Sequence, residues 1–241
     1  EGKEFVGYVI STLGQGSIRP SEARCHKLLA AVSPALEART ISPRRVAQAS
    51  GHIVSLRPCL DPMALMFTRH INIWIQRVVD QSGWDWREVL GDEARRELRV
   101  WMGWFPQWCV RPLWREGEPE MLMAQDASDT AVGGWLGVFN GERKEWDDKD
   151  RQHWVGEVRY EDGVLEAVGR LEKQDLVLSS TYRELYAVFF MIRTFGHLLK
   201  GRWVRIQADN RSLYFIASKG SPTCLQIHNL LVRMFWICAE A

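Results

Sequence analysis

Apolar side chains recur at helical spacing through most of the first hundred residues of the chain. The stretch Phe5 to Ile10 differs, because β-branched, aromatic and apolar side chains alternate there, and Gly14 and Gly16 follow it. This pattern predicts a strand that enters a hairpin turn. After that turn, helices are expected at residues 21–32, 42–56, 61–83 and 92–104.

The expected helix starts carry capping signals. Ser21 can cap the first helix, and Ser42–Pro43 supplies the second with a cap followed by a residue whose φ angle is preset. Asp61–Pro62 repeats this signal farther along the chain. We therefore expect one continuous helix from Asp61 through Ile73 toward Gly83.

The helical spacing stops at residues 106–120, which hold three prolines and a glycine. That composition is typical of a connecting segment, so we place a domain boundary there. Beyond it the pattern predicts two apolar strands, Met121 to Ala124 and Val132 to Phe139, separated by the acidic turn Asp126–Asp129 and a break at Gly133–Gly134.

Strand and helix patterns then alternate to the end of the chain. We expect strands at 154–158 and 164–171, an apolar helix at 182–200, a buried strand at 202–208, and helices at 210–218 and 225–240. The second half is therefore predicted to be a mixed α/β sheet with helices packed on it.

Composition narrows the class of protein. Hydrophobic residues make up 46% and charged residues 25% of 241 residues, and no run reaches the roughly 18 apolar residues of a membrane span. This excludes a disordered chain, and we expect no membrane partner. The formal net charge of +1 excludes a uniformly basic nucleic-acid binder but permits basic patches.

The cysteines and the first residues bear on location. Five scattered cysteines suggest neither a C-x-x-C metal site nor a disulfide framework, so a reducing, intracellular setting is expected. The chain opens on a strand pattern without a signal peptide or an initiator Met, and we expect it to be a piece of a longer polypeptide.

Two groups of side chains in the first half each have two interpretations. Six of the twelve tryptophans fall between Trp74 and Trp108, where they could pack between helices or form platforms that stack nucleic-acid bases. Arg95, Arg96 and Arg99 lie on the polar side of their expected helix, so they form either a solvated face or contacts to a phosphate backbone.

Three acids of the second half stand at element ends. Asp126 follows one expected strand, Asp209 follows another, and Glu184 lies near the start of the apolar helix. Singly, they could be a turn former, a helix cap and a first-turn helix charge. Together, such acids would repel one another, and metal binding is the usual resolution, since carboxylates are the ligands that Mg²⁺ prefers.

The stretches AQDASDTAVGGWLG, SSTYRELYAVFFMIRTFGHLL and VRIQADNRSLYFIASKG occur in this order. They resemble the first three blocks of the ribonuclease H domain of reverse transcriptases, most closely in DIRS-type retrotransposons, which carry a tyrosine recombinase. Upstream, EFVGYVIS resembles the last strand of the polymerase palm, and SPRRVAQASGHIVSL and SGWDWREV resemble thumb and connection helices.

The resemblance implies a domain plan. Residues 1–105 would be the end of the palm plus a mostly α-helical thumb and connection, residues 106–120 a linker, and residues 121–241 an α/β ribonuclease H-like domain. That domain would be incomplete at its C-terminus, because the family has a fourth carboxylate after the last helix. It would also carry an unusually long charged insertion around residues 147–173.

The resemblance also implies chemistry. Asp126, Glu184 and Asp209 fall on the ligands of two Mg²⁺ ions, for which Mn²⁺ can substitute, in an enzyme that cuts the RNA strand of an RNA–DNA hybrid. The order Asp, Glu, Asp favours a nuclease over a strand-transfer enzyme. The partners would be the hybrid and the upstream palm of the same polypeptide. Candidate nucleic-acid contacts are Ser128, Arg183, Asn210, Arg95 and Arg99, while Asp129 flanks the site.

The competing hypothesis is a degenerate or domesticated retroelement fragment that binds nucleic acid or protein without cutting. The near-neutral charge and the missing fourth carboxylate favour it. The presence of all three acids opposes it, because a dead site has no physical reason to keep uncompensated carboxylates together.

Overall fold

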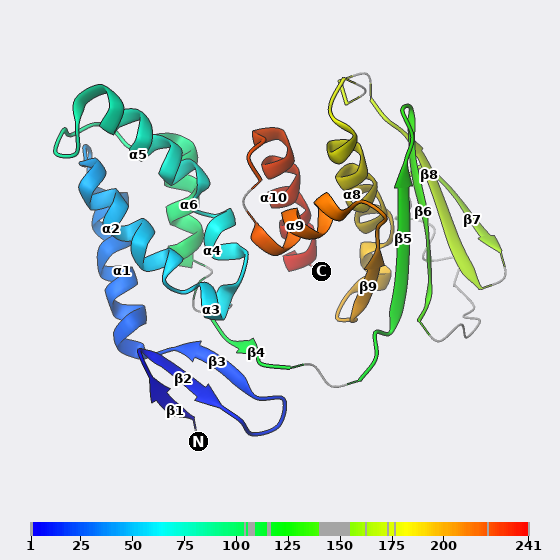
Figure 1. Ribbon diagram of the computed structural model, residues 1–241, viewed down its shortest axis with the longest axis horizontal. Helices are drawn as coiled ribbons and strands as arrows, with labels where there is room; N and C mark the ends of the chain where they lie inside the picture. The colour runs from blue at the N-terminus through cyan, green and yellow to red at the C-terminus, as the bar shows by residue number, and fades with distance from the viewer. Residues whose placement is uncertain are drawn as a thin grey trace. The chain divides into compact units, whose positions relative to one another are not determined.

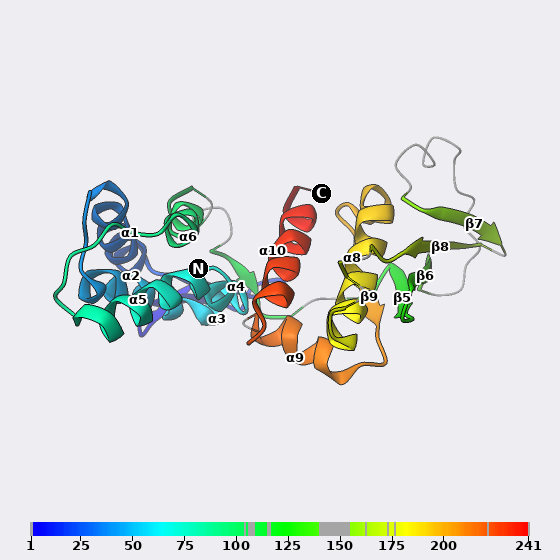
Figure 2. The same ribbon diagram turned by 90° about the horizontal axis from the view of Figure 1, so that it is seen from above.

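The computed structural model describes residues 2–103, 105, 109–114, 117–139, 155–161, 163–172, 174–175, 177–220 and 222–240. It divides into two compact units, shown as ribbons in Figures 1 and 2. Unit 1 comprises Glu1–Glu116 with Ser218–Ser221, and unit 2 comprises Gly117–Ala217 with Pro222–Ala241. The palm, thumb and connection identities of unit 1 stay predictions.

Unit 1 begins with an antiparallel sheet of strands β1 (Lys3–Phe5), β2 (Tyr8–Ser11), β3 (Ser17–Pro20) and β4 (Arg111–Pro112), in that order. The hairpin expected at Gly14 and Gly16 is confirmed, and both glycines have positive φ angles. The single strand expected from Phe5 to Ile10 is wrong. A turn at Val6–Gly7, with φ angles of 49° and 78°, divides it into β1 and β2.

The remainder of unit 1 is helical. Its helices are α1 (Glu22–Glu37), α2 (Pro43–Val54), α3 (Arg57–Leu60), α4 (Met63–Met66), α5 (Arg69–Ser82) and α6 (Asp92–Gly103). Four of them, α1, α2, α5 and α6, pack against one another around buried apolar side chains. The core includes Leu28, Val32, Val46, Ile53, Ile71, Val78 and Leu98.

The continuous helix expected from Asp61 to Gly83 is wrong, because the chain leaves the helix between α4 and α5. At the break, the Thr68 hydroxyl donates to the carbonyl of Ala64 at 2.8 Å. The carboxylate of Glu97 then accepts the backbone N–H groups of His70 and Ile71 at 3.0 and 2.9 Å. A side chain from another helix thus caps α5 and sets where it starts.

The described tryptophans of unit 1 divide into two kinds. Trp74 and Trp101 are buried, and their ring N–H groups donate to the carbonyls of Val89 and Phe67. Trp84 and Trp86 are 46% and 55% exposed, so packing between helices accounts for only part of the cluster. Trp104 and Trp108 lie outside the described residues.

Unit 2 is built on a five-stranded sheet with the order β7-β8-β6-β5-β9. Its strands are β5 (Met121–Ala127), β6 (Ala131–Val138), β7 (Glu157–Glu161), β8 (Val164–Arg170) and β9 (Val204–Gln207). All neighbours pair antiparallel except β5 and β9, which are parallel. The first part of the charged insertion, residues 147–154, lies outside the described residues.

Helix α8 (Ser180–Leu199) packs on β5 and β6, and α10 (Leu225–Glu240) packs on α8 from the side away from the sheet (Figures 1 and 2). The short helix α9 (Arg211–Lys219) follows β9. This mixed sheet with its helices, which follows a mostly helical region, confirms the predicted α/β architecture of the second half of the chain. Among the described residues, no helix is both long and apolar enough to cross a membrane.

Two expectations about the strands of unit 2 are wrong. Gly133 and Gly134 do not break the chain, since β6 continues through them and pairs them with Asp126 and Gln125. A Cβ on Gly134 would lie 2.2 Å from the carbonyl oxygen of Ala124, so glycine is needed for close pairing. Strand β9 is not buried either, because it forms an edge of the sheet and exposes most of its residues.

Candidate metal centre

Asp126 and Asp209 meet at one edge of the sheet of unit 2. Strands β5 and β9 run parallel, with Met121 opposite Val204 and Ala124 opposite Gln207. Continued by two residues, this register sets Asp126 beside Asp209. Because adjacent strands lie about 4.8 Å apart, the sheet brings together two acids that are distant in sequence.

Glu184 comes from helix α8. The helix is capped at its start by Ser179, whose hydroxyl accepts the backbone N–H of Tyr182, so Glu184 lies just after the first turn. Its atom Oε2 is buried and has no hydrogen-bond partner among the described residues. Buried polar atoms are usually paired, so an unpaired carboxylate oxygen needs an explanation.

The pKa of Glu184 indicates that the three acids lie in one site. Burial raises the pKa of the Glu184 carboxyl above its usual range, and the charges of Asp209 and then Asp126 raise it further. Arg183 opposes this shift. Like charges act on one another in this way only when they lie close together, so Glu184 lies within reach of both aspartates.

The two aspartates have different surroundings. Asp126 is exposed, and its Oδ1 accepts the N–H of Ala127 at 2.8 Å, which leaves the other oxygen available. Asp209 is also exposed and precedes Asn210, whose side-chain oxygen accepts the N–H of Ser212 at 2.8 Å. Asn210 therefore caps α9 next to the site.

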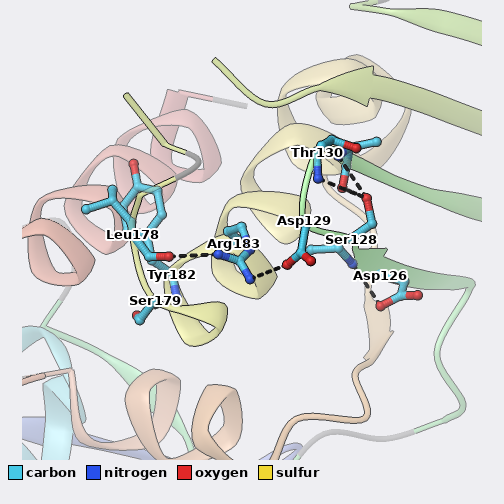
Figure 3. Close-up of polar contacts among 10 residues, drawn as sticks. Asp126, Ser128, Asp129, Thr130, Leu178, Ser179, Tyr182 and Arg183 are labelled. Atoms are coloured by element: carbon cyan, nitrogen blue, oxygen red, sulfur yellow. Dashed lines mark hydrogen bonds and ion pairs between the residues drawn. The ribbon is translucent and has the colours of Figure 1, made fainter. Parts of the chain in front are cut away.

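The candidate nucleic-acid contacts in unit 2 also make bonds inside the protein (Figure 3). The hydroxyl of Ser128 accepts the N–H groups of Thr130 and Ala131, so it orders the turn after Asp126. The guanidinium of Arg183 donates to the carbonyl of Leu178 and to Asp129, both at 2.8 Å. The pairing of Asp129 with Arg183 was missed from the sequence, since the two residues lie 54 positions apart in the chain.

The other two candidate contacts, Arg95 and Arg99, belong to helix α6 of unit 1. Arg95 is half-buried and donates to the carbonyl of Leu36 at 2.7 Å, so it ties α6 to the end of α1. Arg99 is exposed. The exposure of Arg99 is compatible with both a solvated helix face and a phosphate contact, whereas Arg95 connects two helices.

The three acids suit a divalent cation by their chemistry. Hard cations such as Mg²⁺ take oxygen ligands, and the carboxylates of Asp126, Glu184 and Asp209 offer such oxygens from three separate elements. The unpaired Oε2 of Glu184 is the strongest sign, because a cation would supply the partner that this atom lacks among the described residues.

No protein-family model and no curated protein matches the chain. Among solved structures, a foamy viral protease–reverse transcriptase in complex with dsDNA is similar at 12% identity and a TM-score of 0.37, over 90% of this chain and 38% of that one. The dRH form of the foamy viral protease–reverse transcriptase in complex with dsDNA is similar at 11% identity and a TM-score of 0.36, over 98% of this chain and 36% of that one. The foamy viral protease–reverse transcriptase in complex with an RNA/DNA hybrid is similar at 11% identity and a TM-score of 0.36, over 97% of this chain and 28% of that one.

The chain thus spans between 28% and 38% of the length of these three chains. At such low identity and TM-score the similarity is distant. The fold of unit 2 is therefore assigned from its strand order, and its chemistry from its side chains.

Proposed function

We propose that unit 2 is a Mg²⁺-dependent endoribonuclease that hydrolyses the RNA strand of an RNA–DNA hybrid and leaves a 5′ phosphate. Asp126, Glu184 and Asp209 would hold two ions, and Mn²⁺ could replace Mg²⁺. One observation carries the proposal: the buried Oε2 of Glu184 has no hydrogen-bond partner among the described residues, while the charges of Asp209 and Asp126 act on the same carboxyl.

Each acid contributes differently to holding the ions. Asp126 is oriented by its bond from the N–H of Ala127, so one carboxylate oxygen is fixed and the other is free to ligate. Asp209 is exposed at the end of β9, and Glu184 offers an oxygen that is already stripped of water. When bound, a pair of Mg²⁺ ions activates a water and stabilises the leaving 3′ oxygen.

The choice of an RNA–DNA hybrid as substrate rests on the resemblance to reverse transcriptase ribonuclease H domains. Selectivity for RNA would come from contacts to 2′-hydroxyl groups in the wide, shallow minor groove. In the parent polypeptide we expect the site to act together with an upstream polymerase palm, which would hold the same hybrid.

The test is to incubate the chain with an RNA–DNA hybrid labelled on the RNA strand, in Mg²⁺ or Mn²⁺, with labelled dsDNA as a second substrate. We expect RNA cleavage that EDTA stops and that Asp126→Asn and Asp209→Asn remove. Glu161→Gln is the matched control, because it removes an exposed acid from β7 at the far edge of the sheet.

Binding of Mn²⁺, followed by electron paramagnetic resonance, gives a second measurement. A chain that binds no Mn²⁺ and leaves the hybrid intact would refute the proposal. If that chain still retained the hybrid, the non-catalytic binding module would take its place.

A further inference from the structure

Arg183 connects two elements of the candidate metal centre. Its Nη1 donates to the carbonyl of Leu178, just before helix α8, and its Nη2 donates to Oδ1 of Asp129, in the turn between β5 and β6. Both distances are 2.8 Å. Figure 3 shows the guanidinium between these two acceptors. The residue after Arg183 is Glu184, so the bond to Asp129 joins the start of α8 to the turn that follows Asp126.

The turn is held together by its own hydrogen bonds. The hydroxyl of Ser128 accepts from Thr130 and Ala131 at 3.2 and 2.9 Å, and the N–H of Ser128 donates to the carbonyl of Ala131 at 2.9 Å. These bonds tie the turn that carries Asp129 to the strand end that carries Asp126. A displacement of Asp129 is therefore expected to displace the end of β5 as well.

We propose that Arg183 and Asp129 form a positioning pair that sets the spacing between Asp126, at the end of β5, and Glu184, near the start of α8. Neither member needs to touch metal or substrate to act in this way. The inference rests on the proposed function, since the spacing matters only if the two carboxylates share a ligand.

The solvent exposure of the two side chains indicates whether their pairing affects the local geometry of the site or the stability of the whole unit. The side chain of Arg183 is 17% exposed, whereas that of Asp129 is 90% exposed. An ion pair with one partner in water contributes little to the stability of a domain. Loss of the pair is therefore expected to change the geometry of the site more than the melting temperature of the unit.

The pair also bears on the interpretation of Arg183 as a nucleic-acid contact. Two of its guanidinium nitrogens already donate inside the protein, and little of the side chain reaches solvent. The two roles differ in what they predict. A phosphate contact would raise the KM for the hybrid, whereas a positioning residue would weaken metal binding and lower kcat with KM unchanged.

The experiment is a double-mutant cycle on the full chain, with Arg183→Gln, Asp129→Asn and the double variant. We expect each single variant to weaken Mn²⁺ affinity on the order of 10-fold, as is usual for groups that orient metal ligands. The double variant is expected to be no weaker than the single ones, because both remove the same contact.

Matched controls are available in the same elements. Arg193→Gln removes an exposed arginine of α8, and Thr130→Ala changes an exposed side chain of the same turn. Both are expected to leave Mn²⁺ affinity, kcat and KM unchanged. Additive effects in the cycle, effects no larger than those of the controls, or a raised KM with unchanged Mn²⁺ affinity would each overturn the proposal.

Amide hydrogen exchange separates the pair from the metal chemistry. In the metal-free chain, Asp129→Asn is expected to speed exchange at Tyr182 and Arg183, and Arg183→Gln to speed it at Thr130 and Ala131. If neither variant changed exchange in the other element, the proposed pairing of Arg183 with Asp129 would be refuted. Presence of the cross effect in a chain that binds no Mn²⁺ would keep the link between the two elements while refuting the metal site and, with it, the positioning role.

Discussion

Two glutamates, one in each unit, lie in helices and are partly or wholly withdrawn from water, yet their surroundings differ. Glu97 in α6 is buried, and its carboxylate accepts two backbone N–H groups at the start of α5 and interacts with the ring of His70 at 2.9 Å. Glu184 in α8 has a buried oxygen without a hydrogen-bond partner among the described residues and faces two other acids.

The difference separates a structural acid from a candidate ligand. A carboxylate surrounded by donors stabilises the elements that supply them, so Glu97 fixes where α5 begins. A carboxylate surrounded by like charge destabilises the metal-free protein and becomes favourable only when a cation binds. Residue type and burial alone do not distinguish the two glutamates. The groups around each carboxylate, donors for Glu97 and other acids for Glu184, make the distinction.

The largest effect expected from this comparison is on catalysis. Glu184→Gln should lower the rate of hybrid cleavage by at least about 100-fold, because groups that merely orient metal ligands already cost 10–100-fold. Glu97→Gln should leave the rate per folded molecule unchanged. Single-turnover cleavage of labelled hybrid in Mg²⁺ measures both, and equal rates for Glu184→Gln and the unaltered chain would contradict the assignment.

The effect on stability should be larger for a substitution at Glu97 than for one at Glu184. Glu97→Ala is expected to lower the free energy of unfolding of unit 1 by about 2–3 kcal/mol, since two backbone N–H groups at the start of α5 lose their acceptor. Mn²⁺ affinity should not change. Urea denaturation measures the loss, and Glu93→Ala, which removes an exposed acid of the same helix, is the control. A loss no greater than that of the control would make Glu97 dispensable.

A third prediction concerns the backbone that carries Asp126. Gly134→Ala should cost about 1–3 kcal/mol, because its Cβ would lie 2.2 Å from the Ala124 carbonyl oxygen and 2.9 Å from the Cα of Gln125. Mn²⁺ affinity should fall as well. Gly137→Ala in the same strand is the control, since its nearest neighbour would be at 3.6 Å. Equal melting temperatures for the two variants would disprove the close contact.

The smallest effect is a pH dependence of stability. Burial and then the charges of Asp209 and Asp126 raise the pKa of Glu184 in the folded chain. Its contribution to stability is therefore fully present below the unfolded pKa, about 4.3, and is lost as the pH rises through the folded pKa. Glu184→Gln lacks this titration.

Relative to the unaltered chain in EDTA, Glu184→Gln should thus gain in melting temperature between pH 4 and pH 7. Addition of Mg²⁺ at pH 7 should reverse the order, because the cation stabilises only the chain that binds it. A difference in melting temperature that is constant with pH would show that Glu184 carries no excess repulsion.

Local patterns in the sequence were sufficient for much of the fold. Helix α10 has the predicted bounds, and α6 and α8 differ from their predicted spans only at the ends. These helices combine clear apolar spacing with starts or ends that are fixed by nearby residues. The proximity of Glu184 to Asp126 and Asp209 was also expected, because the sequence placed two of these acids at strand ends and the third near the start of a helix.

The errors share a physical cause, which is that distant residues decided the outcome. The helix expected from Asp61 is interrupted where Glu97, from a later helix, caps α5. Local sequence predicts a break at Gly133 and Gly134, because the close pairing that requires glycine there involves β5 and β8, which lie elsewhere in the chain. Strand β9 was expected to be buried, but its position at a sheet edge leaves most of its residues exposed.

The parallel pairing of β5 with β9 has a consequence for the order of folding. The hairpin β5–β6 can form from neighbouring residues, whereas β9 reaches β5 only after β6, β7, β8 and α8 have been placed between them in the chain. Such long-range contacts carry a high loop-closure cost and form late. A growing chain that has completed only the hairpin holds a single carboxylate of the three. The proposed nuclease activity would thus be withheld from a nascent chain until Asp209 has been synthesised and β9 has joined the sheet.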